Sequence, residues 1–460
     1  MSPSRVGNRS AGNVEPNPTG MVRGTGLLLL GQVAGNAGFF AASLIIARAL
    51  GPSGRGAIAF FLASTFLAAY VGRVGFESAA SVYAARDPDR QGVVLTNVLL
   101  FTVPSSVIAG AALVFVMFLL PFELPPSLND AALVAIAGAT VATAFHDVSL
   151  AFLLGCRRYA AYALGFGAGP WVYCVILLAL GAGPGLDISR VILAWIGYRL
   201  ALGLLLLAVA ARGARPTLPD LPLMREMLGY GVRGWPGTIS AFLNLRADQW
   251  LMGFISTEAQ LGAYAVAVSA ADPLLYAPIA AAMALLPVAS ASGGGRRTEA
   301  TLGAVRALLV VTATGIVVAL ALGPTVIPVL FGPEFEVSVR PFLFLLPAPL
   351  GFVLLATFGS ALRGAMAPGR AAGAEVIAAA VGLTLNLVLV PTYGATGAAA
   401  AASLAFIIGG VSALLAYRRL AGFEMRRLRP GRDDLALVWG VARRAAFAAA
   451  NAARGSGRAE

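Results

Sequence analysis

The residues of this chain that could do chemistry are charged side chains inside hydrophobic sequence. In residues 234–290, two apolar stretches joined by the polar turn 256–260 contain Arg246, Asp248 and Asp272. A charge at the centre of a membrane-spanning helix costs at least ~2.5 kcal/mol, so such a side chain normally faces protein or water rather than lipid. Charges in two successive spans therefore predict the wall of a cavity inside a membrane.

Arg246, Asp248 and Asp272 each have two interpretations. At about 1.5 Å per residue, Arg246 is predicted in the outer half of the membrane and Asp272 near its middle. Arg246 would line a cavity and bind an anionic head group, while Asp248 or Asp272 would balance its charge or carry a coupling proton. The alternative is an ion pair between neighbouring helices that only fixes their packing.

The first half of the chain carries similar residues. Arg73 and Glu77 are spaced i, i+4, which is typical of an ion pair within one helix, although Arg73 is also a candidate cavity cation. Arg199 lies mid-span without a charged neighbour within one turn, which makes it a second candidate. His146 and Asp147 are adjacent in one span and suggest either a proton relay or a histidine bonded within a helix bundle.

Composition defines the class of protein. Of 460 residues, 58% are hydrophobic and 12% are charged, whereas soluble domains carry about 25% charged residues. This indicates an all-α polytopic membrane protein. The net charge of +12 lies mainly in short loops, where it sets topology, so no nucleic-acid partner is predicted. The two cysteines, Cys156 and Cys174, match no metal spacing, and we expect no metal, cofactor or catalytic residue.

Hydropathy and loop charge predict twelve spans with both termini in the cytoplasm. Arginines mark alternate loops, as in Arg157 and Arg158 or Arg212 and Arg215, whereas Arg48 and Arg55 are exceptions assigned to an outer loop. The location expected from this pattern is the bacterial cytoplasmic membrane. The predicted spans are 24–48, 55–80, 92–120, 130–154, 160–181, 188–211, 229–254, 261–289, 301–322, 340–362, 371–392 and 396–417.

An internal repeat divides the chain into halves. At an offset of about 206 residues, Gly56–Ala59 matches Gly262–Ala265 in an equivalent span. Six spans per half predict two six-helix lobes, related by pseudo-two-fold symmetry, with a substrate site between them. The expected segments are a disordered cytoplasmic tail (1–22), an N-lobe (23–212), a cytoplasmic linker (213–228), a C-lobe (229–420), and a basic cytoplasmic tail (421–460) that is either an amphipathic helix or partly disordered.

Four stretches resemble a known family. LGPSGRGAIAFFLASTFLAAYVGRVGFESAASVYAARD (50–87) looks like the first-helix-pair signature of bacterial polysaccharide and oligosaccharide-lipid flippases, a family of the multidrug/oligosaccharidyl-lipid/polysaccharide exporter superfamily. Residues 245–290 resemble its seventh and eighth helices, and 329–350 and 385–405 resemble its second-half signatures. The likeness covers about residues 22–420. The first helix, GNAGFFAASLIIARALG, lacks the arginine cluster of the related lipid II flippases, which disfavours peptidoglycan precursors.

The resemblance implies a flippase that moves a lipid-linked (polyprenyl-diphosphate) oligosaccharide or polysaccharide precursor by alternating access. Arginine suits a diphosphate because its planar fork gives two parallel hydrogen bonds and its charge survives burial. The expected partners are the lipid-linked glycan and membrane lipids. Arg246, Arg199 and Arg73 would bind the substrate, and Asp248, Asp272, Glu77 and Asp147 would balance charge or couple an ion.

Three alternatives remain at this stage. A cation-coupled multidrug exporter of the same superfamily would use the acids instead of the arginines. A membrane-embedded glycan polymerase or glycosyltransferase would need a large outer loop or a catalytic domain, and the short loops disfavour it, so no enzyme is expected. A scaffold for glycan-assembly enzymes, which would then be its partners, is the third.

Overall fold

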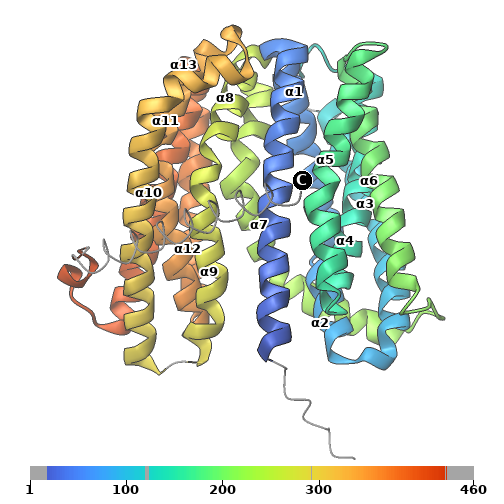
Figure 1. Ribbon diagram of the computed structural model, residues 1–460, viewed down its shortest axis with the longest axis vertical. Coiled ribbons are helices and arrows are strands. Elements are labelled where there is room, and N and C mark those ends of the chain that lie inside the picture. Colours follow the sequence, from blue (N-terminus) through green and yellow to red (C-terminus); the bar gives the residue numbers. More distant parts are fainter. Residues whose placement is uncertain (1–17, 120–123, 292, 430, 432–460) are drawn as a thin grey trace, which may run out of the picture.

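The computed structural model describes residues 18–119, 124–291, 293–429 and 431, and these residues are helical or in short connections, without a strand (Figure 1). Two short 3-10 helices lie between α-helices (η1 Pro88–Arg90 and η2 Pro333–Ser338), and a third, η3 Met425–Leu428, follows the last one. The α-helices are α1 Pro18–Arg73, α2 Phe76–Arg86, α3 Gln91–Leu119, α4 Asp130–Gly155, α5 Tyr159–Ala182, α6 Ile188–Ala211, α7 Leu221–Ile255, α8 Glu258–Ala271, α9 Pro273–Ala291, α10 Gly294–Phe331, α11 Val339–Leu345, α12 Ala348–Gly364 and α13 Pro368–Ala421.

The two longest helices each turn back at a glycine. In α1, Gly51 adopts φ 65° and ψ −174°, and in α13, Gly394 adopts φ 55° and ψ −133°. Glycine has no Cβ and reaches positive φ without steric cost. Each of these helices therefore contains two successive spans. We call the end of the bundle at Gly51 and Gly394 the kink end, and the opposite end, where α1 begins, the tail end (Figure 1).

The remaining spans complete the predicted fold. In the described part of the chain, eight helices are long and apolar enough to cross a membrane, and Pro333–Leu345 with α12, bent by 47° at the break between them, passes the same test as a pair. Asp272 separates α8 from α9 within the predicted eighth span. With α7 and the two halves of α1 and α13, the twelve-span, two-lobe fold is confirmed.

Buried apolar residues form one shared core at the kink end and two separate cores at the tail end. The shared core combines N-lobe residues such as Phe60 with C-lobe residues such as Tyr264 and Phe331. Toward the tail end, one core belongs to the N-lobe and another to the C-lobe, around Phe358. The lobes are therefore packed together at the kink end in this conformation.

Backbone contact and polar contacts join the lobes at the kink end. Gly56 of α1 lies against Gly262 of α8, so that a Cβ on Gly56 would lie 1.9 Å from the Glu258 carbonyl oxygen. The Glu258 carboxylate accepts hydrogen bonds from the backbone N–H and the hydroxyl of Ser127, at 2.8 and 2.7 Å. Arg48 donates to the carbonyl oxygens of Val329 and Leu330 at 2.6 and 2.7 Å.

Helix α7 begins earlier than the predicted seventh span. The Asp220 side chain caps it by accepting a hydrogen bond from the Leu223 backbone N–H. Leu223 and Met227 then pack into the N-lobe core, because their apolar side chains share one face of the first turns. The predicted linker 213–228 thus includes the start of a helix that lies against the N-lobe.

The predicted terminal segments fall largely outside the described residues. Helix α1 begins at Pro18, inside the predicted N-terminal tail, and residues 1–17 are not described. The expected amphipathic helix after residue 432 also lies outside the described residues. Of the basic C-terminal segment, Phe423 packs into the C-lobe core beside Phe358, and Arg427 pairs with Glu299.

Candidate functional site

A carboxylate of the N-lobe holds two arginines from different helices. Asp147 of α4 accepts a hydrogen bond from Arg73 Nη1, at the end of α1, at 2.6 Å. Its other oxygen accepts one from Arg199 Nη1, in the middle of α6, at 2.9 Å. Arg73 and Arg199 are 3% and 5% exposed. The lone arginine of the sixth predicted span therefore has a counterion from another helix.

Glu77 and His146 complete this N-lobe cluster. The predicted i, i+4 ion pair is present, with Arg73 Nε 2.7 Å from the Glu77 carboxylate. His146 Nδ1 lies 2.7 Å from Arg199 Nη1. The same nitrogen lies 3.0 Å from Asp147 Oδ1, so it either accepts from the guanidinium or donates to the carboxylate, depending on the tautomer. Two arginines thus face two carboxylates, and the charge of the cluster is balanced within the N-lobe.

Aromatic rings line the guanidinium groups of the N-lobe cluster. Arg73 lies 4.6 Å from the centre of the Tyr70 ring, and Arg199 lies 4.7 Å from that of Trp195 and 5.5 Å from that of Tyr198. A cation over an aromatic face gains about 0.5–2 kcal/mol. These contacts stabilise the two buried charges where they are.

The C-lobe contains a second ion pair. Arg246 of α7 donates from Nη2 to Asp272, between α8 and α9, at 2.8 Å. The Arg246 side chain is 36% exposed, far more than the N-lobe arginines. Of its five N–H donors, one has a hydrogen-bonded acceptor among the described residues. Arg246 is therefore the candidate cation with donors left for a ligand.

Asp248 takes no part in that ion pair. Its carboxyl accepts a short hydrogen bond from the hydroxyl of the fully buried Tyr264 and another from the Gln249 backbone N–H at 2.7 Å. Asp248 and Asp272 both line a small open pocket in the C-lobe, together with Asn244 and Tyr264. The pocket places two carboxyl groups and two neutral polar groups against an otherwise apolar wall.

The structure thus sorts the predicted site residues into two groups. Arg73, Glu77, Asp147 and Arg199 form one cluster, and Arg246 and Asp272 form one pair, with Asp248 apart from both. Sequence reasoning missed Tyr264 as the partner of Asp248. It also assigned Arg55 to an outer loop, whereas Arg55 is buried; the uninterrupted apolar run after it was the available signal.

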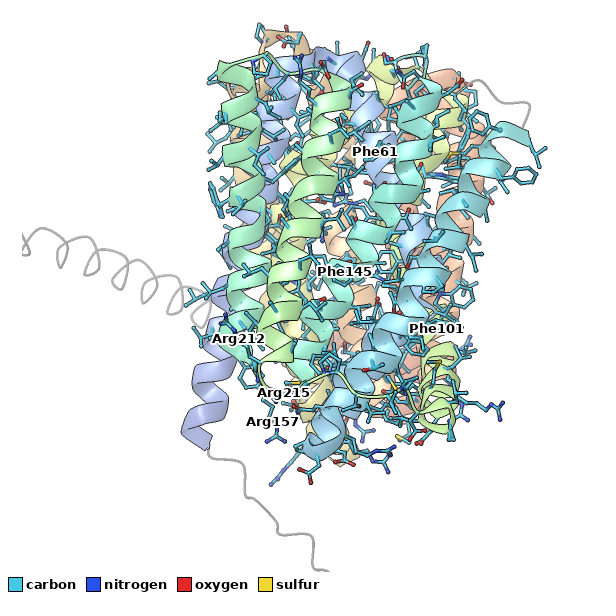
Figure 2. All side chains as sticks on the ribbon, turned by 90° about the vertical axis from the view of Figure 1, so that its right-hand side faces the viewer. Phe61, Phe101, Phe145, Arg157, Arg212 and Arg215 are labelled. Carbon is cyan, nitrogen blue, oxygen red and sulfur yellow. The ribbon has the colours of Figure 1, made fainter. Side chains whose placement is uncertain are left out.

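Three of the loop arginines lie together at one end of the molecule. Arg157, Arg212 and Arg215 lie at the tail end of the N-lobe, whereas Phe61 lies toward the kink end and Phe145 of α4 about midway (Figure 2). Because Phe145 precedes His146 and Asp147 directly, the N-lobe cluster lies at mid-depth of the bundle. Positive charge at one end and buried charge at mid-depth is the distribution expected of a multi-pass transport protein.

A family profile described as polysaccharide biosynthesis protein matches residues 45–340. This match spans both charged groups, from Arg73 to Asp272, and most of both lobes. Among curated protein sequences, none matches the chain significantly.

Solved structures share the fold at low sequence identity. The inward closed conformation of the lipid II flippase MurJ superposes with a TM-score of 0.67 at 12% identity, covering 88% of this chain and 89% of that one. The inward-facing conformation of a multidrug resistance MATE family transporter of the MOP superfamily gives 0.65 at 13% identity, covering 84% and 94%. An outward-facing conformation of such a transporter gives 0.58 at 16% identity, covering 88% and 95%.

Proposed function

The chain belongs to the polysaccharide biosynthesis protein family, and from this premise we propose that it is a flippase rather than an enzyme. Its substrate is a lipid-linked (polyprenyl-diphosphate) oligosaccharide or polysaccharide precursor, carried across the bacterial cytoplasmic membrane. The twelve-span fold, shared with a lipid II flippase and with MATE transporters, supports transport but leaves the substrate open. The substrate must therefore be inferred from the charged side chains of this chain.

The partial exposure of Arg246 is the observation that best supports this proposal. Its guanidinium is partly exposed and most of its donors have no described acceptor, so it can take one phosphate of a diphosphate while Asp272 holds its other side. Arginine binds phosphate through two parallel charge-assisted hydrogen bonds. Arg73 and Arg199 would act later, since a phosphate reaches them only in exchange for Asp147.

The tail end is the cytoplasmic end in this proposal, with both termini inside. Arginines of alternate loops lie there, as bacterial topology requires, and Arg157, Arg212 and Arg215 are examples (Figure 2). The kink end is then the outer end, and the joined core at that end corresponds to a conformation closed to the outside. Rocking of the N-lobe (23–212) against the C-lobe (229–420) would open the kink end and close the tail end.

The test is leaflet exposure of a lipid-linked oligosaccharide in proteoliposomes. We expect exposure that depends on the protein and falls at least tenfold in Arg246→Gln. Arg363→Gln is the matched control, because Arg363 also forms a half-exposed ion pair, with Glu375 at 2.7 Å, but lies nearer the tail end. Equal transport by Arg246→Gln and the unsubstituted protein would refute Arg246 as the substrate cation.

One observation favours a second candidate, a cation-coupled multidrug exporter. The C-lobe pocket is lined by Asp248 and Asp272 without an arginine, which suits a cationic drug or a coupling cation. The same proteoliposomes distinguish the candidates: export of a cationic dye that Asp248→Asn abolishes and Arg246→Gln spares would establish the exporter.

A further inference from the structure

Arg55 is a buried arginine to which the proposed function gives no role. It lies just after the kink in α1 and is 8% exposed. Its Nη2 donates to the Ser43 hydroxyl at 3.2 Å and to the Ser269 hydroxyl at 3.4 Å, and the two hydroxyls lie 3.1 Å apart. Ser43 belongs to the N-lobe and Ser269 to the C-lobe, so the guanidinium bridges the lobes where they are closed.

Arg55 differs from the other buried arginines in its charge balance. Arg73 and Arg199 share Asp147, whereas no ion pair joins Arg55 to a carboxylate among the residues that the structure describes. Its Nε is buried without a hydrogen-bond partner there, as is that of Arg199. A buried charge held only by two hydroxyls is left uncompensated. The group that would satisfy Arg55 is an anion.

Arg55 lies near the pair that carries the proposed function. Ser269, which contacts Arg55, precedes Asp272 by three residues along α8, so the two lie about one helical turn apart on the same side. Asp272 in turn holds Arg246. Ser269 is the nearer of the two to the start of α8 at the kink end. A phosphate that leaves Arg246 toward the kink end would therefore meet Arg55 next.

We propose that Arg55, with Ser43, is a second phosphate-binding site, which becomes accessible when the kink end opens for substrate release and Ser269 moves away. Separation of the lobes pulls Ser269 away from Ser43 and exposes the guanidinium fork, which then binds a phosphate through two N–H donors. The Ser43 hydroxyl, which stays with Arg55 in the N-lobe, supplies one further donor. This inference rests on the proposed function and adds the position from which the lipid-linked substrate leaves.

Binding of farnesyl diphosphate to the purified full-length chain tests the site, with farnesol as the uncharged control. Gly262→Leu is expected to hold the kink end open, because a side chain there meets the α1 backbone. In that background we expect Arg55→Gln to raise the Kd for farnesyl diphosphate at least tenfold and to leave farnesol binding within twofold. In the unsubstituted background, with Arg55 buried, Arg55→Gln should change the Kd less than twofold and Arg246→Gln at least fivefold.

Three results would overturn the proposal. An unchanged Kd for Arg55→Gln in the Gly262→Leu background would make Arg55 only a latch between the lobes. If phosphatidylglycerol competes for the site with the same affinity as farnesyl diphosphate, the site binds ordinary phospholipid. Arg55→Lys keeps the positive charge but lacks the guanidinium fork, so it provides a second test if Arg55→Gln does not fold. Full affinity for farnesyl diphosphate in Arg55→Lys would refute binding through two N–H donors. If farnesyl diphosphate binding depends on Arg55 but the protein exposes no lipid-linked oligosaccharide in proteoliposomes, the proposed flippase function is refuted and the anion site stands.

Discussion

Gly56 and Gly262 occupy equivalent positions in the two lobes, and each lies directly against the backbone that precedes the other. A Cβ on Gly56 would lie 1.9 Å from the Glu258 carbonyl oxygen, and a Cβ on Gly262 would lie 1.9 Å from the Pro52 carbonyl oxygen. The contact is reciprocal, as in an interface across a two-fold axis. Glycine at both positions is therefore what allows the lobes to meet at the kink end.

A larger residue at Gly262 should open the kink end. No rotamer of Gly262→Leu avoids the α1 backbone, so we expect the lobes to separate there. Ser43→Cys, buried in the closed conformation, would report the change in a variant with Cys156 and Cys174 replaced by serine. A membrane-impermeant maleimide should label it at least tenfold faster in Gly262→Leu. The control is Gly197→Leu, because a Cβ on Gly197 meets nothing within 4 Å; equal labelling in both would contradict the gate.

Loss of the Asp147 charge should destabilise the N-lobe more than loss of the Glu77 charge. Asp147→Asn leaves both Arg73 and Arg199 buried without their shared carboxylate, and an uncompensated buried charge costs about 3–5 kcal/mol. Glu77→Gln leaves Arg73 its bond to Asp147. We expect thermal unfolding in detergent to begin at clearly lower temperature for Asp147→Asn. A smaller loss for Asp147→Asn than for Glu77→Gln would show that Asp147 does not hold the cluster.

The sequence predicted the fold because its signals are local. The hydropathy of a span depends only on the residues within it. The internal repeat, with an offset of about 206 residues, is likewise recognised from short motifs such as Gly56–Ala59. The i, i+4 pair of Arg73 with Glu77 was predicted for the same reason, since helical geometry brings these residues together within one element.

Partners from different helices could not be predicted. Whether Arg199 of α6 meets Asp147 of α4 depends on how each helix is rotated, and rotation is set by packing rather than by spacing. Arg55 was misplaced because hydropathy assigns a charged residue at a span boundary to the loop, whereas close approach of two helices at Gly56 and Gly262 buries it. Both cases depend on tertiary contacts.

Asp272 should weaken substrate binding, because its negative charge, held on the other side of the Arg246 guanidinium, repels the bound phosphate. Removal of one negative charge about 8 Å from a bound phosphate is worth roughly 2 kcal/mol at an effective dielectric constant of 20, or more than tenfold in Kd. We therefore expect Asp272→Asn to bind farnesyl diphosphate at least tenfold more tightly and to turn over more slowly, since release is also slowed. Weaker binding by Asp272→Asn would mean that positioning of Arg246 by Asp272 outweighs this repulsion.

Tyr264 should be needed for the stability of the C-lobe through its hydroxyl. The hydroxyl donates to Asp248 in a buried setting, so Tyr264→Phe leaves a polar carboxyl without one of its donors, at a cost of about 1–3 kcal/mol. Tyr276→Phe is the matched control, because the Tyr276 hydroxyl makes no hydrogen bond within the described ranges. We expect the midpoint of thermal unfolding to fall for Tyr264→Phe and to stay unchanged for Tyr276→Phe. If both variants unfold at the same temperature as the unsubstituted protein, Asp248 finds its donor elsewhere. Tyr264 is then not the residue that fixes the Asp248 carboxyl in the C-lobe pocket.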